Sequence, residues 1–107
     1  MRIQKFEDIL AWQKSQYLAV DIYGIMDEIK DFGFKNQICR ASVSISNNIA
    51  EGFDRKSDLD FAKFLYYSLA SCSEVRSMLY LAERLLYIDK EKANKLREQT
   101  FEISKMD

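Results

Sequence analysis

The chain of 107 residues contains no histidine and no proline, and it has only three glycines and two cysteines. The missing histidines remove the commonest general acid–base group and the commonest metal ligand, so Ser–His and Cys–His catalytic pairs are excluded. Proline and glycine are the strongest breakers of regular structure, and their scarcity favours long uninterrupted helices. The length supports one domain that spans residues 1–107.

Segments that would direct the chain to a membrane or form a phosphate site are also missing. No run approaches the ~18 continuous apolar residues of a membrane span. Charged residues stand in MRIQKFEDIL where a signal peptide would have its apolar segment. The glycines are too far apart for a phosphate-binding loop. Cys39 and Cys72 are too few for a disulfide framework and are expected to be small buried hydrophobes. We therefore expect a cytoplasmic protein with no membrane contact, catalytic residue, cofactor or metal.

Apolar residues recur at three- and four-residue steps in four segments, which predicts an all-α fold. The first helix is expected from about Glu7 to Lys30, with Gly33 as the stop signal, and the second from about Asn36 to Gly52. The third follows a capping residue, Ser57, for about 29 residues, and the fourth follows Asp89 for about 18. Short connections make neighbours antiparallel, so the sequence predicts an up-down-up-down four-helix bundle whose last helix is short.

The third segment has the clearest periodicity. At ~1.5 Å per residue it reaches roughly 43 Å, against roughly 27 Å for the fourth. We therefore expect part of its seam to be exposed, and to be covered by another subunit or by a C-terminal tail that this sequence lacks. The seam residues alternate four and three apart: Phe61, Leu65, Ser68, Cys72, Val75, Leu79, Ala82 and Leu86.

The stretch SISNNIAEGF, residues 44–53, places two asparagines inside the second helix. Helical spacing puts Asn47 on a polar stripe and Asn48 on the apolar seam, so a turn is the poorer explanation. We hypothesise that Asn48 and Glu51 reach across to the third helix and fix its register, with Ser71 and Glu74 as candidate partners.

Ion pairs are the default interpretation for Glu51 and Glu74, because ion-pair networks often place carboxylates beside apolar seams. The expected partners are Arg40, Arg55 or Arg76.

Charge is balanced over the chain, with a net of −1, but residues 35–56 carry four basic and two acidic residues. The basic side chains are candidate nucleic-acid contacts: Lys35, Arg40, Arg55 and Lys56. A nucleic-acid domain usually has a stronger basic footprint, so a solvated helix face is the alternative.

Three stretches resemble the 23S rRNA intervening-sequence protein family, also called the four-helix bundle protein family. FEDILAWQKSQYLAVDIY, residues 6–23, is similar to its amino-terminal signature. FAKFLYYSLASCSEV, residues 61–75, resembles its third signature at Phe64, Leu65, Ser71 and Glu74. QICRASVSISNNIAEGFDRK, residues 37–56, is similar to its central motif at Gln37, Arg40, Ala41, Ser44, Ile45, Asn48, Ile49, Ala50, Glu51 and Gly52.

The chain departs from the family pattern at three positions. Members usually have proline and serine where this chain has Ser46 and Asn47, and glycine where it has Ala70. Because a helix-interior proline removes a backbone donor and kinks a helix, its loss should straighten the second helix.

The resemblance implies a non-enzymatic bacterial protein. Members are encoded within insertions in large-subunit ribosomal RNA genes or elsewhere in genomes. A related branch, the accessory variability proteins of diversity-generating retroelements, looks like four-helix bundles assembled as pentamers that bind nucleic acid and a reverse transcriptase.

Two functions follow as expectations. The first is a homo-oligomeric nucleic-acid-associated accessory protein, with the small basic excess repeated around a ring. The second is an oligomeric scaffold or adaptor that binds another protein. Its cue is the exposed seam and aromatic residues such as Tyr66, Tyr67 and Tyr80.

Overall fold

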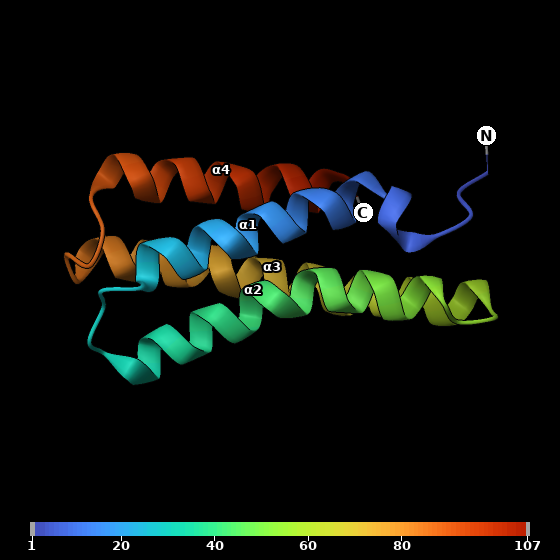
Figure 1. Cartoon of the computed structure of the whole chain (residues 1–107), viewed down its shortest axis with the longest axis horizontal. Helices are drawn as coiled ribbons and strands as arrows, with labels where there is room; N and C mark the ends of the chain where they lie inside the picture. The colour runs from blue at the N-terminus through green and yellow to red at the C-terminus, as the bar shows by residue number, and fades with distance from the viewer. Residues whose placement is uncertain (1, 107) are drawn as a thin grey trace.

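The computed structural model describes residues 2–106, and these residues form four α-helices after one short 3-10 turn. The 3-10 turn covers Phe6–Asp8, and the helices are α1 (Leu10–Met26), α2 (Phe32–Phe53), α3 (Asp58–Arg84) and α4 (Lys90–Met106). Successive helices run in opposite directions along the long axis of the molecule (Figure 1). The all-α up-down-up-down prediction is therefore confirmed.

The four helices form a square in which each helix packs against two neighbours. The packed pairs are α1 with α2, α2 with α3, α3 with α4, and α4 with α1, and the most extensive of these is α2 with α3. Within the described residues, α1 and α3 lie across the diagonal with no two Cα atoms within 8 Å, and so do α2 and α4. The outer faces of α1 and α3 therefore point to opposite sides of the bundle.

The core lies between the helices and follows the apolar periodicity of the sequence. Fully buried branched side chains from all four helices meet there, including Leu18, Ile22, Ile45, Leu79 and Ile103. Cys39 and Cys72 are both buried, as expected. Five hydroxyl residues are also buried, and each donates a hydrogen bond to a backbone carbonyl: Ser15, Ser42, Ser46, Ser68 and Thr100.

The first helix is shorter than predicted at both ends. Ile9 takes an extended conformation and separates α1 from the 3-10 turn. There the Gln13 side chain donates to the carbonyl of Glu7, and the Phe6 ring packs edge-on against Trp12 at 5.3 Å. At the other end, Lys35 Nζ donates to the carbonyl of Asp27 just past the helix. These side-chain bonds replace backbone bonds that a longer helix would have made.

The start of α2 also differs from the prediction. Gly33 does not end the first helix, because it lies in the first turn of α2 and no described glycine has a positive φ. The N-cap is Asp31, whose carboxylate accepts from the backbone N–H of Phe34 at 3.2 Å. The sequence predicted that the glycine of DFGF ends the first helix. In the structure the aspartate of DFGF starts the second helix instead.

The caps of α3 and α4 are confirmed. Ser57 Oγ accepts from the N–H of Asp60 at 3.1 Å, and Asp89 Oδ1 accepts from the N–H of Lys92 at 2.8 Å. Both side chains satisfy a backbone donor that the first turn leaves free. No described helix is both long enough and apolar enough to cross a membrane.

The prediction that part of the α3 seam is exposed is confirmed, but the exposed part is short. From Ser68 to Ala82 the seam residues are buried by the chain itself, since α4 packs beside that part of α3. Only Phe61 and Leu65, at the start of α3, are half-buried. Leu86 is not part of the seam, because α3 ends at Arg84 and Leu86 lies in the connection to α4.

Candidate functional site

Part of the central motif lies on the face where α2 packs against α3, and side chains there link the two helices. The hydroxyls of Ser44 and Ser71 are hydrogen-bonded at 2.6 Å, and Gln37 Nε2 donates to Glu74 Oε2 at 3.2 Å. Deeper in the interface, Ser68 Oγ donates to the carbonyl of Ile45 at 2.9 Å. We call Gln37, Ser44, Ser71 and Glu74 the polar cluster.

The register link between α2 and α3 uses different partners from those predicted. Asn48 is half-buried, but its side-chain amide donates to the carbonyl of Ser44 on its own helix at 2.8 Å. Glu51 is exposed, and among the described residues neither Glu51 nor Glu74 lies in an ion pair. Ser44 and Gln37, rather than Asn48 and Glu51, reach Ser71 and Glu74. The helical pattern placed the right face, but it could not tell which side chain on that face is long enough to cross.

Gly52 sets how closely α2 and α3 approach at the far end of this face. A Cβ added at Gly52 would lie 2.6 Å from the Cβ of Phe64 and 3.0 Å from the ring of Phe61. Contacts below 3.0 Å essentially do not occur, so a side chain here would push the helices apart. Arg55, just beyond Gly52, places its guanidinium over the Phe64 ring at 4.8 Å.

A hollow of about 560 Å³ opens beside the polar cluster. It is lined by Gly33, Asn36, Gln37, Arg40, Ala41, Ser44 and Glu74. Within the described part of the chain, Arg40 makes no ion pair, so its guanidinium is available to an outside group. One cation beside one carboxylate gives a polar surface with no net charge.

The four candidate nucleic-acid contacts do not form one patch. Lys35 stands near the start of α2 and donates to the carbonyl of Asp27, whereas Arg55 and Lys56 follow its end. Twenty residues separate Lys35 from Arg55, which at ~1.5 Å per residue is roughly 30 Å. Arg40 lies between them on the polar face. Sequence counting grouped these cations because they are close in the chain, but a long helix spreads them along the molecule.

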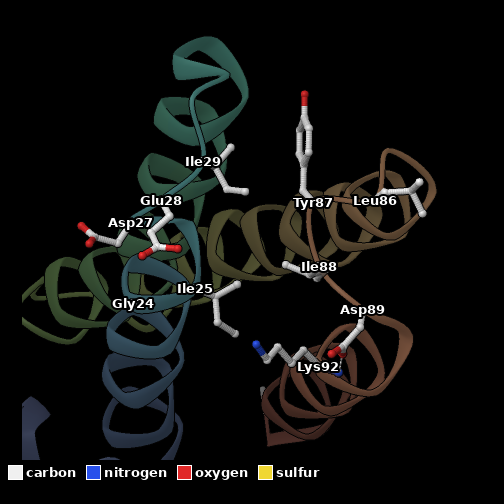
Figure 2. Close-up of a pocket in the computed structure, with 10 residues that line it drawn as sticks. All are labelled: Gly24, Ile25, Asp27, Glu28, Ile29, Leu86, Tyr87, Ile88, Asp89 and Lys92. Atoms are coloured by element: carbon white, nitrogen blue, oxygen red, sulfur yellow. Dashed lines mark hydrogen bonds between the residues drawn. The ribbon is translucent and has the colours of Figure 1, made fainter.

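A second hollow, of about 740 Å³, lies at the end of the bundle that holds the α1–α2 and α3–α4 connections, between these two connections (Figure 2). Its lining includes Asp27, Glu28 and Asp89 with one lysine, Lys92. Across residues 2–106, no group of three or more His, Cys, Asp or Glu side chains could hold a metal ion. This hollow therefore offers separate charged groups rather than a converging site.

One hydrogen bond joins the two connections at this end. Tyr87 OH donates to Asp31 Oδ2 at 2.7 Å, and the Tyr87 ring packs edge-on against Phe34 at 5.4 Å. The bond from Tyr87, together with the N–H of Phe34, lowers the pKa of Asp31 below its ordinary value. The same bond raises the pKa of Tyr87, because the donated proton is held by the carboxylate. No local pattern could predict this pair, since its members are 56 positions apart.

Comparisons with known proteins agree with the resemblance. The family model described as 23S rRNA-intervening sequence protein matches residues 7–106. A crystal structure of a protein with unknown function from the S23 ribosomal protein family, from Bacteroides thetaiotaomicron VPI-5482, is similar, with a TM-score of 0.85 and 32% identity. The similarity covers 91% of this chain and 94% of that one. No protein of curated function matches the chain.

Proposed function

The chain belongs to the 23S rRNA-intervening sequence protein family, and from that premise we propose that it is a non-enzymatic, cytoplasmic scaffold built from several copies of itself. The observation that carries this proposal is a pair of apolar outer faces on opposite sides of the bundle. Cytoplasmic residence is supported by the presence of only two cysteines, too few for a disulfide framework, because disulfides are rare in that compartment.

The outer face of α1 repeats with alternating steps of three and four residues. Tyr17 and Val20 are 72% and 69% exposed, and Leu10 is also exposed. We call this set the α1 stripe, and it consists of Leu10, Gln13, Tyr17, Val20, Gly24 and Asp27. Such a repeat is what a helix uses to pack along another helix.

The outer face of α3 has the same kind of repeat. Leu59 and Tyr66 are 81% and 72% exposed, and small residues separate them from a second apolar group at Tyr80 and Leu81. We call this set the α3 stripe, and it consists of Leu59, Lys63, Tyr66, Ala70, Ser73, Ser77, Leu81 and Arg84. By contrast, the outer faces of α2 and α4 are mostly polar or charged.

The charges on the two stripes are complementary. The α1 stripe ends at Asp27, with Glu28 beside it, and the α3 stripe contains Lys63 and Arg84 but no acid. Because α1 and α3 run in the same direction (Figure 1), Asp27 and Arg84 lie toward the same end of the bundle. A second copy in the same orientation could set its α3 stripe on the first copy's α1 stripe with opposite charges facing.

Contact between two different faces has a consequence for assembly. Every incomplete assembly keeps one free α1 stripe and one free α3 stripe. Copies therefore continue to add until a ring closes or a filament forms. A closed ring of identical copies, a pentamer among the possible sizes, is the assembly we favour.

The proposal is tested by the mass in solution of three proteins: the natural chain, an α1-stripe variant (Tyr17→Glu with Val20→Glu) and an α3-stripe variant (Tyr66→Glu). We expect an assembly for the natural chain and monomers for both variants, whose exposed positions leave folding intact. Asn47→Glu, on the polar face of α2, is the matched control and should keep the natural mass.

Mixing the two variants separates this contact from a symmetric one. Each variant keeps one intact face, so the mixture should form a one-to-one dimer and nothing larger. A monomeric natural chain at high concentration, or variants that assemble normally, would refute the proposal.

Nucleic-acid contact is the second candidate function, and it depends on assembly. The four candidate basic residues are spread along one copy. A ring would repeat Arg40 and the Arg55–Lys56 pair once per copy and so increase the basic surface. Filter binding of ribosomal RNA and an unrelated RNA at several salt concentrations tests it. Phosphate contacts predict an affinity that falls steeply with salt, and no binding at low salt would end the idea.

A further inference from the structure

At the end of the bundle that holds the α2–α3 turn, α2 and α3 extend beyond the described parts of α1 and α4. Cys72 on α3 lies beside α4, since its Sγ donates to the carbonyl of Thr100 at 3.1 Å. From Thr100 to the end of α4 at Met106 the chain continues for roughly 9 Å, whereas α3 extends from Cys72 back to Asp58 for roughly 21 Å. The turn between α2 and α3 therefore projects past the ends of α1 and α4 (Figure 1).

An apolar hollow of about 680 Å³ lies beside the first turns of α3 at this end, with Ile3, Ile9 and Leu10 on its N-terminal side. Phe53, Phe61 and Leu65 line it from α2 and α3, and Met106 lines it from the end of α4. Phe61 and Leu65, both half-buried, are the part of the predicted α3 seam that the chain leaves incompletely covered. Phe61 and Leu65 lie four residues apart and begin the three- and four-residue spacing of the α3 seam, which is the spacing that packs against another helix, so the element that fits beside them is a helix.

The rim of this hollow is basic. Arg2, Arg55 and Lys56 line it, and the one acidic residue in the lining is Asp58. The four residues give a net charge of +2 in a chain whose total is −1. Among the described residues none of these cations forms an ion pair, so their charges are not neutralised within the copy.

We propose that this hollow binds an acidic amphipathic helix of a partner protein. Apolar side chains at positions i, i+4 and i+7 of that helix would enter the hollow, and its carboxylates would meet the basic rim. Another copy of this chain is a poorer occupant, because its α4 carries five basic and three acidic residues and its apolar α1 stripe is occupied in the self-assembly proposed above. The lining is mostly apolar rather than rich in hydrogen-bonding groups, which favours a helix over a nucleic-acid base.

The probe is a synthetic 15-residue helical peptide with leucines at those spacings and glutamates on its other faces, labelled for fluorescence anisotropy. A matched peptide has lysine in place of every glutamate. We expect the full-length protein to bind the acidic peptide and not the basic one. Rim pairs steer and select a partner, so binding of the acidic peptide should weaken as salt is raised from low to high concentration.

Arg55→Glu with Lys56→Glu reverses the rim charge, and we expect it to weaken binding of the acidic peptide roughly tenfold or more. Lys30→Glu with Lys90→Glu makes the same charge change on exposed residues at the opposite end and should leave the affinity unchanged. Circular dichroism and solution mass are recorded for each variant. The salt series on the natural chain remains decisive if the rim variant does not fold.

Equal binding of the two peptides, no binding of either, or an affinity indifferent to both salt and rim charge would overturn the inference. So would a single-stranded RNA that binds with the same dependence on Arg55 and Lys56 while the acidic peptide does not. The proposed self-assembly is judged separately, because its variants lie on the outer faces of α1 and α3 and its readout is mass.

Discussion

Gly52 is the residue at which the smallest change should have a large effect. Its hydrogen leaves just enough room for Phe64 and Phe61 of α3, and the clash with the Phe64 Cβ involves an atom fixed to the backbone. A flexible side chain could turn away, but a Cβ moves only with its helix. The glycine therefore holds α2 and α3 at their short separation.

Gly52→Ala should lower the free energy of unfolding by about 1–3 kcal/mol, the usual cost of overpacking a core. Gly33→Ala is the matched control, because its added methyl would meet only Asp31 Oδ1 at 3.8 Å. In an open helical position alanine should raise stability by roughly 0.5–1 kcal/mol. Urea unfolding measures the free energy of unfolding of both variants. Equal values would show that the close approach at Gly52 does not constrain the helices.

Leu86 is the described non-glycine residue with a positive φ, 61°, and its side chain is 88% exposed. It ends α3 in a Schellman motif: the N–H of Tyr87 donates to the carbonyl of Ala82, and the N–H of Leu86 to that of Glu83. Figure 2 shows the leucine at the outer edge of the α3–α4 connection. Glycine is the usual residue at this position, so Leu86 holds a strained conformation without burying its side chain.

Leu86→Gly should therefore raise the free energy of unfolding by about 1 kcal/mol, since the left-handed conformation costs other residues roughly 1–2 kcal/mol. Leu85→Gly is the matched control: Leu85 has a φ of −81°, so glycine there relieves no strain and should destabilise the protein. Thermal unfolding compares the two variants. A loss of stability in Leu86→Gly would mean that the leucine side chain contributes contacts that outweigh the strain.

Among the elements, the hydrogen bond from Tyr87 to Asp31 holds the α3–α4 connection to the α1–α2 connection. Asp31 has a lowered pKa, so its contribution to stability is present above its ordinary pKa of 3.8 and is lost as the pH falls through the folded value. Tyr87 has a raised pKa, so its contribution is present below its ordinary pKa of 10.0 and is lost as the pH rises through the folded value.

Tyr87→Phe keeps the ring on Phe34 and removes the hydroxyl. The melting temperature of the natural chain should exceed that of the variant through the neutral range, and the difference should shrink below about pH 4 and above about pH 10. Thermal melts across this range measure the difference. A constant difference at all pH values would show that the hydroxyl acts through packing rather than through the carboxylate.

The elements were the part of the molecule most open to prediction. Periodicity located four helices and most of the core, and the caps at Ser57 and Asp89 were read correctly because capping depends on local sequence. Gly33 was misread, since aspartate and glycine in DFGF suit either a stop or a start. The polar cluster could not be assigned in detail, because Gln37 and Glu74 meet only after α2 and α3 have packed.

For the whole molecule, the proposed assembly couples stability to concentration. If copies associate through the α1 and α3 stripes, the melting temperature should rise with protein concentration, because mass action favours the folded, assembled state. The α1-stripe variant, with Tyr17→Glu and Val20→Glu, should melt at a temperature independent of concentration. Calorimetry over a hundredfold range of concentration makes the comparison, and a flat response from the natural chain would argue against assembly.

The two ends of the described chain meet at one place, with Arg2, Ile3 and Met106 all lining the apolar hollow beside the α2–α3 turn. An affinity tag fused to either terminus would therefore emerge at the mouth of that groove and compete with any ligand for it. Pull-down experiments with terminally tagged protein would then miss the very partner they were meant to capture. A tag-free preparation, or a label attached through the opposite end of the bundle, avoids this interference.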